Sequence, residues 1–198
     1  MMTLKEFGEN LEKLNQAYEM LKKKYKKPEI GKTIEVAGIT WKVLDKLEDG
    51  YLVISDKFYG SDRKFDANCN NWKVSQLRTE FNTKLRKKIE DELGSGLLVE
   101  FERDLTSLDG QTEYGKCEDY VSAVTTDEYK KYRKYLPNMG RYWWTITPDS
   151  TSCNGDSTCV CVVSGGGYVS RSGYYCNNGV RPVCIFSSSI FESEEEEE

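Results

Sequence analysis

The sequence predicts an α+β protein, because helical and strand patterns occupy separate blocks of its 198 residues. The first block spaces apolar residues by three and four, and a second block, residues 76–93, spaces them by four. Both spacings are typical of a helix with one apolar face. The other blocks are short runs that alternate apolar and polar residues between glycine and aspartate turns, which is the pattern of strands.

The first 28 residues predict a helix whose apolar residues fall on heptad positions a and d. We expect Pro28 to end this helix. A stripe confined to two positions is narrower than the face of a helix that covers a globular core, which favours a coiled coil and a homo-oligomer formed through residues 4–25. An amphipathic helix lying on its own domain is the alternative. The seam consists of Leu4, Phe7, Leu11, Leu14, Tyr18, Leu21 and Tyr25.

Residues 29–191 are expected to form one domain, followed by an acidic, disordered tail at 192–198. Gly94 should end the central helix, and Thr126 should cap a short helix within 125–135. The turn at residues 48–50 should join two strands. The stripe of the central helix is Leu77, Phe81, Leu85, Ile89 and Leu93, and strands are expected within 32–57, 97–105, 117–125, 141–146, 158–164, 167–172 and 180–186.

The composition argues against several classes of protein. Asp and Glu outnumber Lys and Arg by 33 to 28, so no nucleic-acid partner is expected. No apolar run approaches the roughly 18 residues of a membrane span, and the charged N-terminus is unlike a signal peptide, so we expect synthesis in the cytoplasm and no membrane insertion. The chain has no histidine and no C-x-x-C pair among its seven cysteines, so we expect free thiols and neither metal nor cofactor.

The residues from 145 to 191 are drawn from a restricted set of amino acids. Lys, Glu, Gln, Met and Trp are absent from these 47 residues, although they make up 46 of the 144 residues before them. A buried segment would be rich in Leu and Ile, whereas this one is rich in Ser, Gly, Tyr, Cys and Asn. Exposed loops normally keep some Lys or Glu. Neither burial nor exposure by itself accounts for the composition.

Three sequence boxes resemble those of a large bacterial and phage family of uncharacterised domains. They are a W-x-x-S-x-L-R helix at residues 72–78, a W-W-x-x-(S/T)-P box at 143–148 and a closing N-G-V-R-P strand at 178–182. The similarity covers about residues 32–186. The family is similar to the C-type-lectin fold, in the branch shared with formylglycine-generating enzymes and with the variable proteins of diversity-generating retroelements.

In these retroelements a reverse transcriptase copies a template with errors at adenines, and the copy replaces the 3′ part of a gene for a receptor-binding protein. The resemblance therefore implies a hypervariable ligand-binding protein, with a variable region at about 145–186, that acts on a virion or in the cytoplasm. An AAC codon randomised at both adenines can never yield Lys, Glu, Gln, Met or Trp, the five residues that the segment lacks. The ligand would be a protein or a carbohydrate specific to this variant.

The residues expected to vary combine small polar side chains with Tyr and Arg, which dominate binding hot spots. A carbohydrate- or protein-binding module without variation is the main alternative. The related formylglycine-generating enzymes use a cysteine pair, but no histidine or ordered acid/base pair accompanies the cysteines here, so we expect no enzyme. Calcium-lectin motifs such as E-P-N are absent. The candidate binding residues are Ser152, Asn154, Asp156, Tyr168, Ser170, Arg171, Ser172, Tyr174, Tyr175, Cys176 and Asn177.

The fixed side of the variable region is expected to be anchored by the two tryptophans of the second box. Alternation along a strand predicts that Val169 points inward, whereas Tyr168 and Ser170 point outward. Tyr174, after the turn, is also expected to point outward. Gly167 and Gly179 are expected at turns that need a positive φ. Arg181 lies between apolar residues and is expected to be a structural hydrogen-bond donor.

Overall fold

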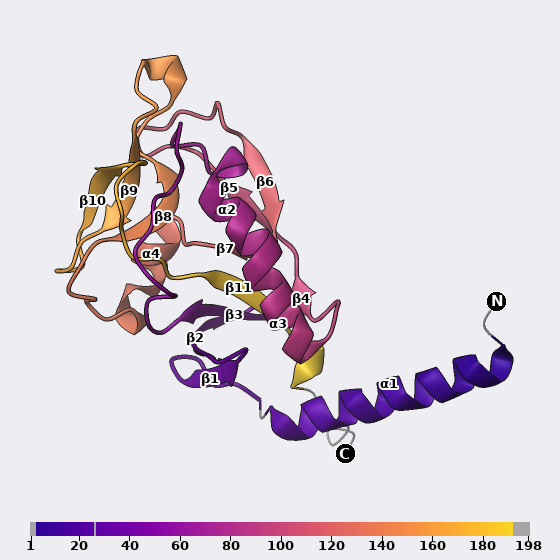
Figure 1. Ribbon diagram of the computed structural model, residues 1–198. Coiled ribbons are helices and arrows are strands. Elements are labelled where there is room, and N and C mark those ends of the chain that lie inside the picture. Colours follow the sequence, from indigo (N-terminus) through magenta and orange to yellow (C-terminus); the bar gives the residue numbers. More distant parts are fainter. Residues whose placement is uncertain (1–2, 26, 192–198) are drawn as a thin grey trace.

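The computed structural model describes residues 3–25 and 27–191, so the tail expected at 192–198 lies outside the described residues. The chain is α+β, as the sequence predicts, with an N-terminal helix and antiparallel sheets. Figure 1 shows helix α1 extending away from the other elements, which pack together.

Helix α1 (Leu4–Lys24) uses the two halves of the expected seam differently. Near its C-terminal end, the Tyr18 hydroxyl donates to the Ser189 carbonyl at 3.0 Å, and Tyr25, just beyond the helix, is buried in the core. The first half of the seam is exposed to solvent. Its side chains and their exposed fractions are Leu4 (91%), Phe7 (52%), Leu11 (47%) and Leu14 (66%).

The largest sheet is built around two central strands, β3 and β11. Every residue of β3 is buried, and its side chains alternate between two core clusters, with Val53 in one cluster and Leu52 and Ile54 in the other. β3 begins at Gly50, in agreement with the expected turn. The strand order is β1 (Thr33–Val36), β2 (Ile39–Lys46), β3 (Gly50–Ser55), β11 (Val183–Ser187) and β4 (Leu98–Val99), and β7 (Val121–Ser122) also pairs with β11.

The central helical segment contains a π-helical turn that the sequence analysis did not predict. The segment comprises η1 (Trp72–Val74), α2 (Gln76–Glu80), the π turn η2 (Phe81–Leu85) and α3 (Arg86–Leu93). Because an α-helix has 3.6 residues per turn, each four-residue step over-rotates the apolar stripe by about 40°. The wider π turn takes up part of this drift, and all five stripe residues are buried. Gly94 ends the helix with a φ of 99°, as expected.

The second sheet has the order β10 (Val169–Gly173), β9 (Cys159–Val163) and β8 (Trp143–Pro148). Trp143 and Trp144 are adjacent on β8, so they point to opposite sides and join different core clusters. Their exposed fractions are 1% and 0%. Both tryptophans therefore anchor the core, as the sequence predicts.

Helix α4 (Thr126–Tyr132) has Thr125 as its N-cap, so the prediction of Thr126 was wrong. The Thr125 hydroxyl accepts from the Glu128 N–H at 3.0 Å, and the Glu128 carboxylate accepts from the Thr125 N–H at 2.8 Å, which forms a capping box. The Thr126 N–H instead donates to the Thr147 hydroxyl of β8. The other elements are η3 (Arg133–Tyr135), η4 (Ser152–Asn154), η5 (Ser188–Ile190) and the paired strands β5 (Phe101–Asp104) and β6 (Lys116–Asp119).

Three residues that bracket β10 and β11 have structural roles. Gly167 has a φ of 85°, as expected. The expectation for Gly179 was wrong, because its φ is not positive; a Cβ there would lie 2.4 Å from the ring of Phe58, so close packing is what requires glycine. Arg181 is fully buried and its Nε donates to the Ser55 carbonyl at 2.9 Å, which confirms a structural donor. Its burial lowers its pKa to about 10.

Candidate ligand-binding face

The eleven candidate residues come from three segments that lie next to one another: the loop 152–156, the stretch 168–172 and the segment 174–177. Antiparallel pairing of β10 with β9 places Gly173 opposite Cys159, and the Tyr174 N–H donates to the Thr158 carbonyl at 3.0 Å. We call the eleven residues the β10 face. Its exposed members are Ser152, Asn154, Asp156, Tyr168, Arg171, Tyr175 and Asn177, and its half-buried members are Ser170, Ser172, Tyr174 and Cys176.

The loop 152–156 is held by a carboxylate from outside the variable region. Glu113 accepts from the Ser152 hydroxyl at 2.8 Å and from the Cys153 N–H at 2.9 Å. The hydrogen bonds from the Cys153 thiol and amide, followed by that from Ser152, lower the pKa of Glu113 to about 2. The carboxylate is thus ionised at neutral pH and fixes the start of the loop.

A shallow hollow connects the same loop to β10. Asp109 accepts from the Asn154 side chain at 3.1 Å, and the Arg171 guanidinium donates to Asp149 at 3.0 Å. The Arg171 side chain is 69% exposed, so this ion pair positions it at the surface and contributes little to stability. Leu108, Ser150 and Asp156 complete the lining of the hollow.

Tyrosines lie at both ends of β10. Tyr168 is 62% exposed and forms a hydrogen bond with Tyr142 that raises the pKa of Tyr142. At the other end, Tyr175 is 54% exposed and packs edge to face on Tyr174, with ring centroids 5.3 Å apart. Tyr174 is half-buried and also packs against the core, so the expectation that it points only outward was wrong.

Four neighbours that support the β10 face were not predicted from the sequence. Tyr142, Asp109 and Glu113 precede the variable region, and Asp149 lies inside it but was not selected. The only local signal was the L-D-G turn that contains Asp109. Contacts between residues about 40 positions apart bring Glu113 and Asp109 to the loop, and Asp149 meets Arg171 across 22 positions, and no local pattern reports such contacts.

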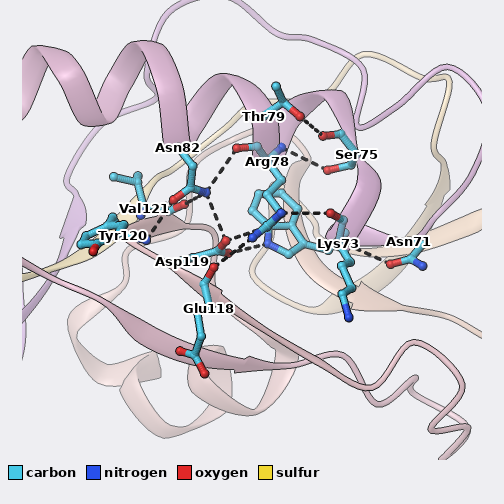
Figure 2. Close-up of polar contacts among 11 residues, drawn as sticks. Asn71, Lys73, Ser75, Arg78, Thr79, Asn82, Glu118, Asp119, Tyr120 and Val121 are labelled. Atoms are coloured by element: carbon cyan, nitrogen blue, oxygen red, sulfur yellow. Dashed lines mark hydrogen bonds and ion pairs between the residues drawn. The ribbon is translucent and has the colours of Figure 1, made fainter.

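A second polar cluster surrounds Asp119 and is structural (Figure 2). The fully buried Asp119 carboxylate accepts from Trp72 Nε1 at 2.7 Å, Arg78 Nε at 2.6 Å and Asn82 Nδ2 at 3.1 Å. The Asn82 oxygen, on the π turn, accepts from two main-chain N–H groups beside β7. Since the carboxylate has three internal donors and no exposure, Trp72 and Arg78 of the first sequence box tie the helix to β6, and Asp119 itself is not accessible to a ligand.

The seven cysteines are free thiols, as the sequence predicts. Burial raises the pKa of Cys161 to about 12 and that of Cys184 well above its usual value. The hydrogen bond to Glu113 raises the pKa of Cys153, and desolvation raises that of Cys159. Protonated thiols are weak nucleophiles, so Cys153, Cys159, Cys161 and Cys184 are poorly suited to covalent chemistry at neutral pH.

Within residues 3–25 and 27–191, no group of three or more His, Cys, Asp or Glu side chains is placed to hold a metal ion. In the same part of the chain, no helix combines the length and the apolar character that crossing a membrane requires.

The fold and the β10 face define an α+β protein that presents an edge strand and two flanking segments to solvent. The chain belongs to the family described as a domain of unknown function (DUF6273), whose model matches residues 90–188. The match runs from α3 to the end of β11 and contains the whole β10 face. No curated protein and no solved structure matches the chain, so its likeness to the C-type-lectin fold stays a prediction.

Proposed function

We propose that the chain is a ligand-binding protein of C-type-lectin type, whose β10 face is diversified by adenine mutagenesis in a retroelement. One observation carries the proposal. Within the compositionally restricted segment, every candidate residue is exposed or half-buried, while the stretch 160–163 between them and the stretch 183–186 after them are buried. Variation at the exposed positions of the face would therefore leave the core unchanged.

The division between face and core has an energetic basis. Substitutions at exposed positions without special contacts usually change stability by no more than about 0.5 kcal/mol. Core substitutions such as Trp to Ala cost about 3–5 kcal/mol. A protein whose surface residues are rewritten repeatedly can stay folded only if the rewritten positions avoid the core. The exposed positions of the β10 face do so, and Tyr174, which packs against the core, is the exception.

The side chains of the face suit recognition of a ligand. Tyr168, Arg171 and Tyr175 are exposed, and such residues supply most of the energy of binding hot spots. Ser170, Ser172 and Asn177 lie among them and offer adaptable hydrogen bonds, as similar residues do in antibody loops.

The main alternative to this proposal is a carbohydrate- or protein-binding module whose residues do not vary. A second alternative is an oxidase of the formylglycine-generating type. The raised pKa values of Cys153, Cys159 and Cys161 disfavour the oxidase, because such chemistry starts from a thiolate. They leave both binding hypotheses open.

The DNA sequence separates variable from static binding. Adenine mutagenesis of AAC alters only the first two bases, so codons in the β10 face should mostly end in C, namely those of Tyr168, Ser170, Ser172, Tyr174, Tyr175, Cys176 and Asn177. A near-repeat of the segment, with AAC at these sites and beside a reverse-transcriptase reading frame, should lie downstream. Mixed third bases together with the absence of such a repeat would refute diversification and favour a static module.

The exposed half of the α1 seam supports a homo-oligomer as part of the proposal. Four apolar side chains over two heptads are free to pair with another copy. In the second half of the seam, Tyr18 donates to the Ser189 carbonyl and Tyr25 is buried in the core, so the stretch left for pairing is short, and we expect weak association. Weak pairing would still raise the avidity of the β10 face for a multivalent ligand.

A further inference from the structure

Strand β10 forms one edge of the three-stranded sheet, and no described strand covers its outer side. The opposite edge, along β8, is closed. There the Trp144 N–H donates to the Gly179 carbonyl at 3.0 Å, and the Ile146 N–H donates to the Val124 carbonyl at 2.9 Å. Figure 1 shows β10 on the outer left of the molecule. Only one edge of this sheet is therefore available for pairing.

The register determines which main-chain groups of β10 point outward. In an antiparallel pair, successive residues alternate between bonding to the partner strand and pointing away from it. The Tyr174 N–H bonds to the Thr158 carbonyl at 3.0 Å, and the register continues without a shift, so the even-numbered residues of β10 bond to β9. The main-chain groups of Val169 and Arg171 point away, and no hydrogen bond between described residues outside this ladder engages them.

We infer that the β10 edge binds an extended segment of a protein ligand, which adds a fourth strand to the sheet. The inference rests on the proposed function and specifies its ligand class. Val169 and Arg171 offer two N–H donors and two carbonyl acceptors in the alternating spacing of a strand. A polypeptide main chain has the same alternation, whereas the hydroxyl groups of a sugar do not.

Edge pairing would solve a problem that a diversified surface creates. Main-chain hydrogen bonds do not depend on side-chain identity, so they keep a constant part of the affinity when the variable residues change. Tyr168 precedes the open edge, Ser170 lies within it, and Tyr175 follows it, so these side chains would select among segments. The Gly173 carbonyl is already occupied by the Cys176 N–H at 2.8 Å, which limits the open edge to about three residues.

The first test needs no ligand. In the isotope-labelled full chain, NMR-detected hydrogen exchange should be fast at the amides of Val169 and Arg171. It should be slow at the amides of Ser170 and Ser172, which bond to β9. Protection of Val169 and Arg171 in the free protein would overturn the inference, because the edge would then be closed.

The second test compares Arg171→Pro with Arg171→Ala in the full chain. Both variants lose the side chain, but only proline loses the outward N–H, and proline is tolerated at such edge positions. The probes are a displayed library of random linear peptides and an array of glycans. Peptides selected on the unaltered chain should bind Arg171→Pro at least about tenfold more weakly than Arg171→Ala, because a lost donor leaves the peptide carbonyl unpaired. They should also protect the amides of Val169 and Arg171.

The outcomes separate the two proposals. Selected peptides that bind both variants equally, or that leave these two amides exchanging, would overturn edge pairing but not ligand binding by the face. Glycan binding without peptide binding would have the same consequence. If neither probe binds, edge pairing and the proposed function both fail. If Arg171→Pro does not fold, protection of the two amides by peptide in the unaltered chain decides the question.

Discussion

Replacing Trp144 by alanine should destabilise the whole protein, because this indole is a central part of the core. The side chain is fully buried and packs edge to face on Phe65, with centroids 5.6 Å apart. Its Nε1 donates to the Arg63 carbonyl at 2.8 Å. Core Trp to Ala substitutions cost about 3–5 kcal/mol. Because 1 kcal/mol shifts the Tm of a chain of this size by about 2–4 °C, we expect Tm to fall by about 6–20 °C.

The matched control replaces Tyr168, Arg171 and Tyr175 together by serine. All three side chains are exposed, so the summed cost should stay below about 1.5 kcal/mol and the fall in Tm below about 6 °C. Tyr174 is left in place because it packs against the core.

Thermal unfolding followed by far-UV circular dichroism measures both effects. Trp144→Phe should give an intermediate loss, about 1–3 kcal/mol, because a ring remains but the Arg63 carbonyl loses its donor. If the triple variant melts as early as Trp144→Ala, the three side chains belong to the core, and our division between face and scaffold is wrong.

Three further predictions concern the scaffold, the loop and α1. Asp119→Ala should lower the free energy of unfolding by about 3–5 kcal/mol, because a buried ion pair loses one partner. A free energy of unfolding, measured with denaturant, that stays within about 1 kcal/mol of the value for the unaltered chain would contradict this. The pKa of Glu113 is lowered from 4.5 to about 2, so its stabilisation of the loop is complete above pH 4.5 and is lost as the pH falls through about 2. An NMR titration of the Cys153 amide, which donates to Glu113, should have its midpoint near pH 2. A midpoint near 4.5 would refute the anchoring role of Glu113. The double variant Leu11→Glu, Leu14→Glu should abolish the concentration-dependent self-association that light scattering measures. Met20 is exposed but lies off the seam, so Met20→Glu should not abolish it. Equal masses for the unaltered chain and both variants would exclude pairing through the seam.

Local patterns were sufficient to locate most helices and strands. Apolar runs and alternation predicted β2, β3, β8 and β11. A strand buried on both faces has successive apolar residues, and a strand buried on one face alternates apolar and polar residues, so the sequence shows both cases directly. The steps of four predicted the central helix but not its π turn, because Asn82 acquires its partners there from segments about 40 residues away. The sequence did distinguish Thr125 from Thr126 as caps, because only Thr125 is followed three residues later by a glutamate, Glu128, which is the capping-box pattern that the prediction overlooked.

The sequence by itself determined the α+β class, the apolar seam of α1 and the restricted composition of the region that contains the β10 face. These properties depend on the residue types and their spacing, which the chain carries before it folds. The tertiary structure alone decided that Tyr18 and Tyr25 of the seam contact their own chain, that Glu113 and Asp109 hold the loop, and that β10 is the open edge of its sheet. Each of these depends on which distant segments meet, and pairing between distant segments is set by the packing of the whole core.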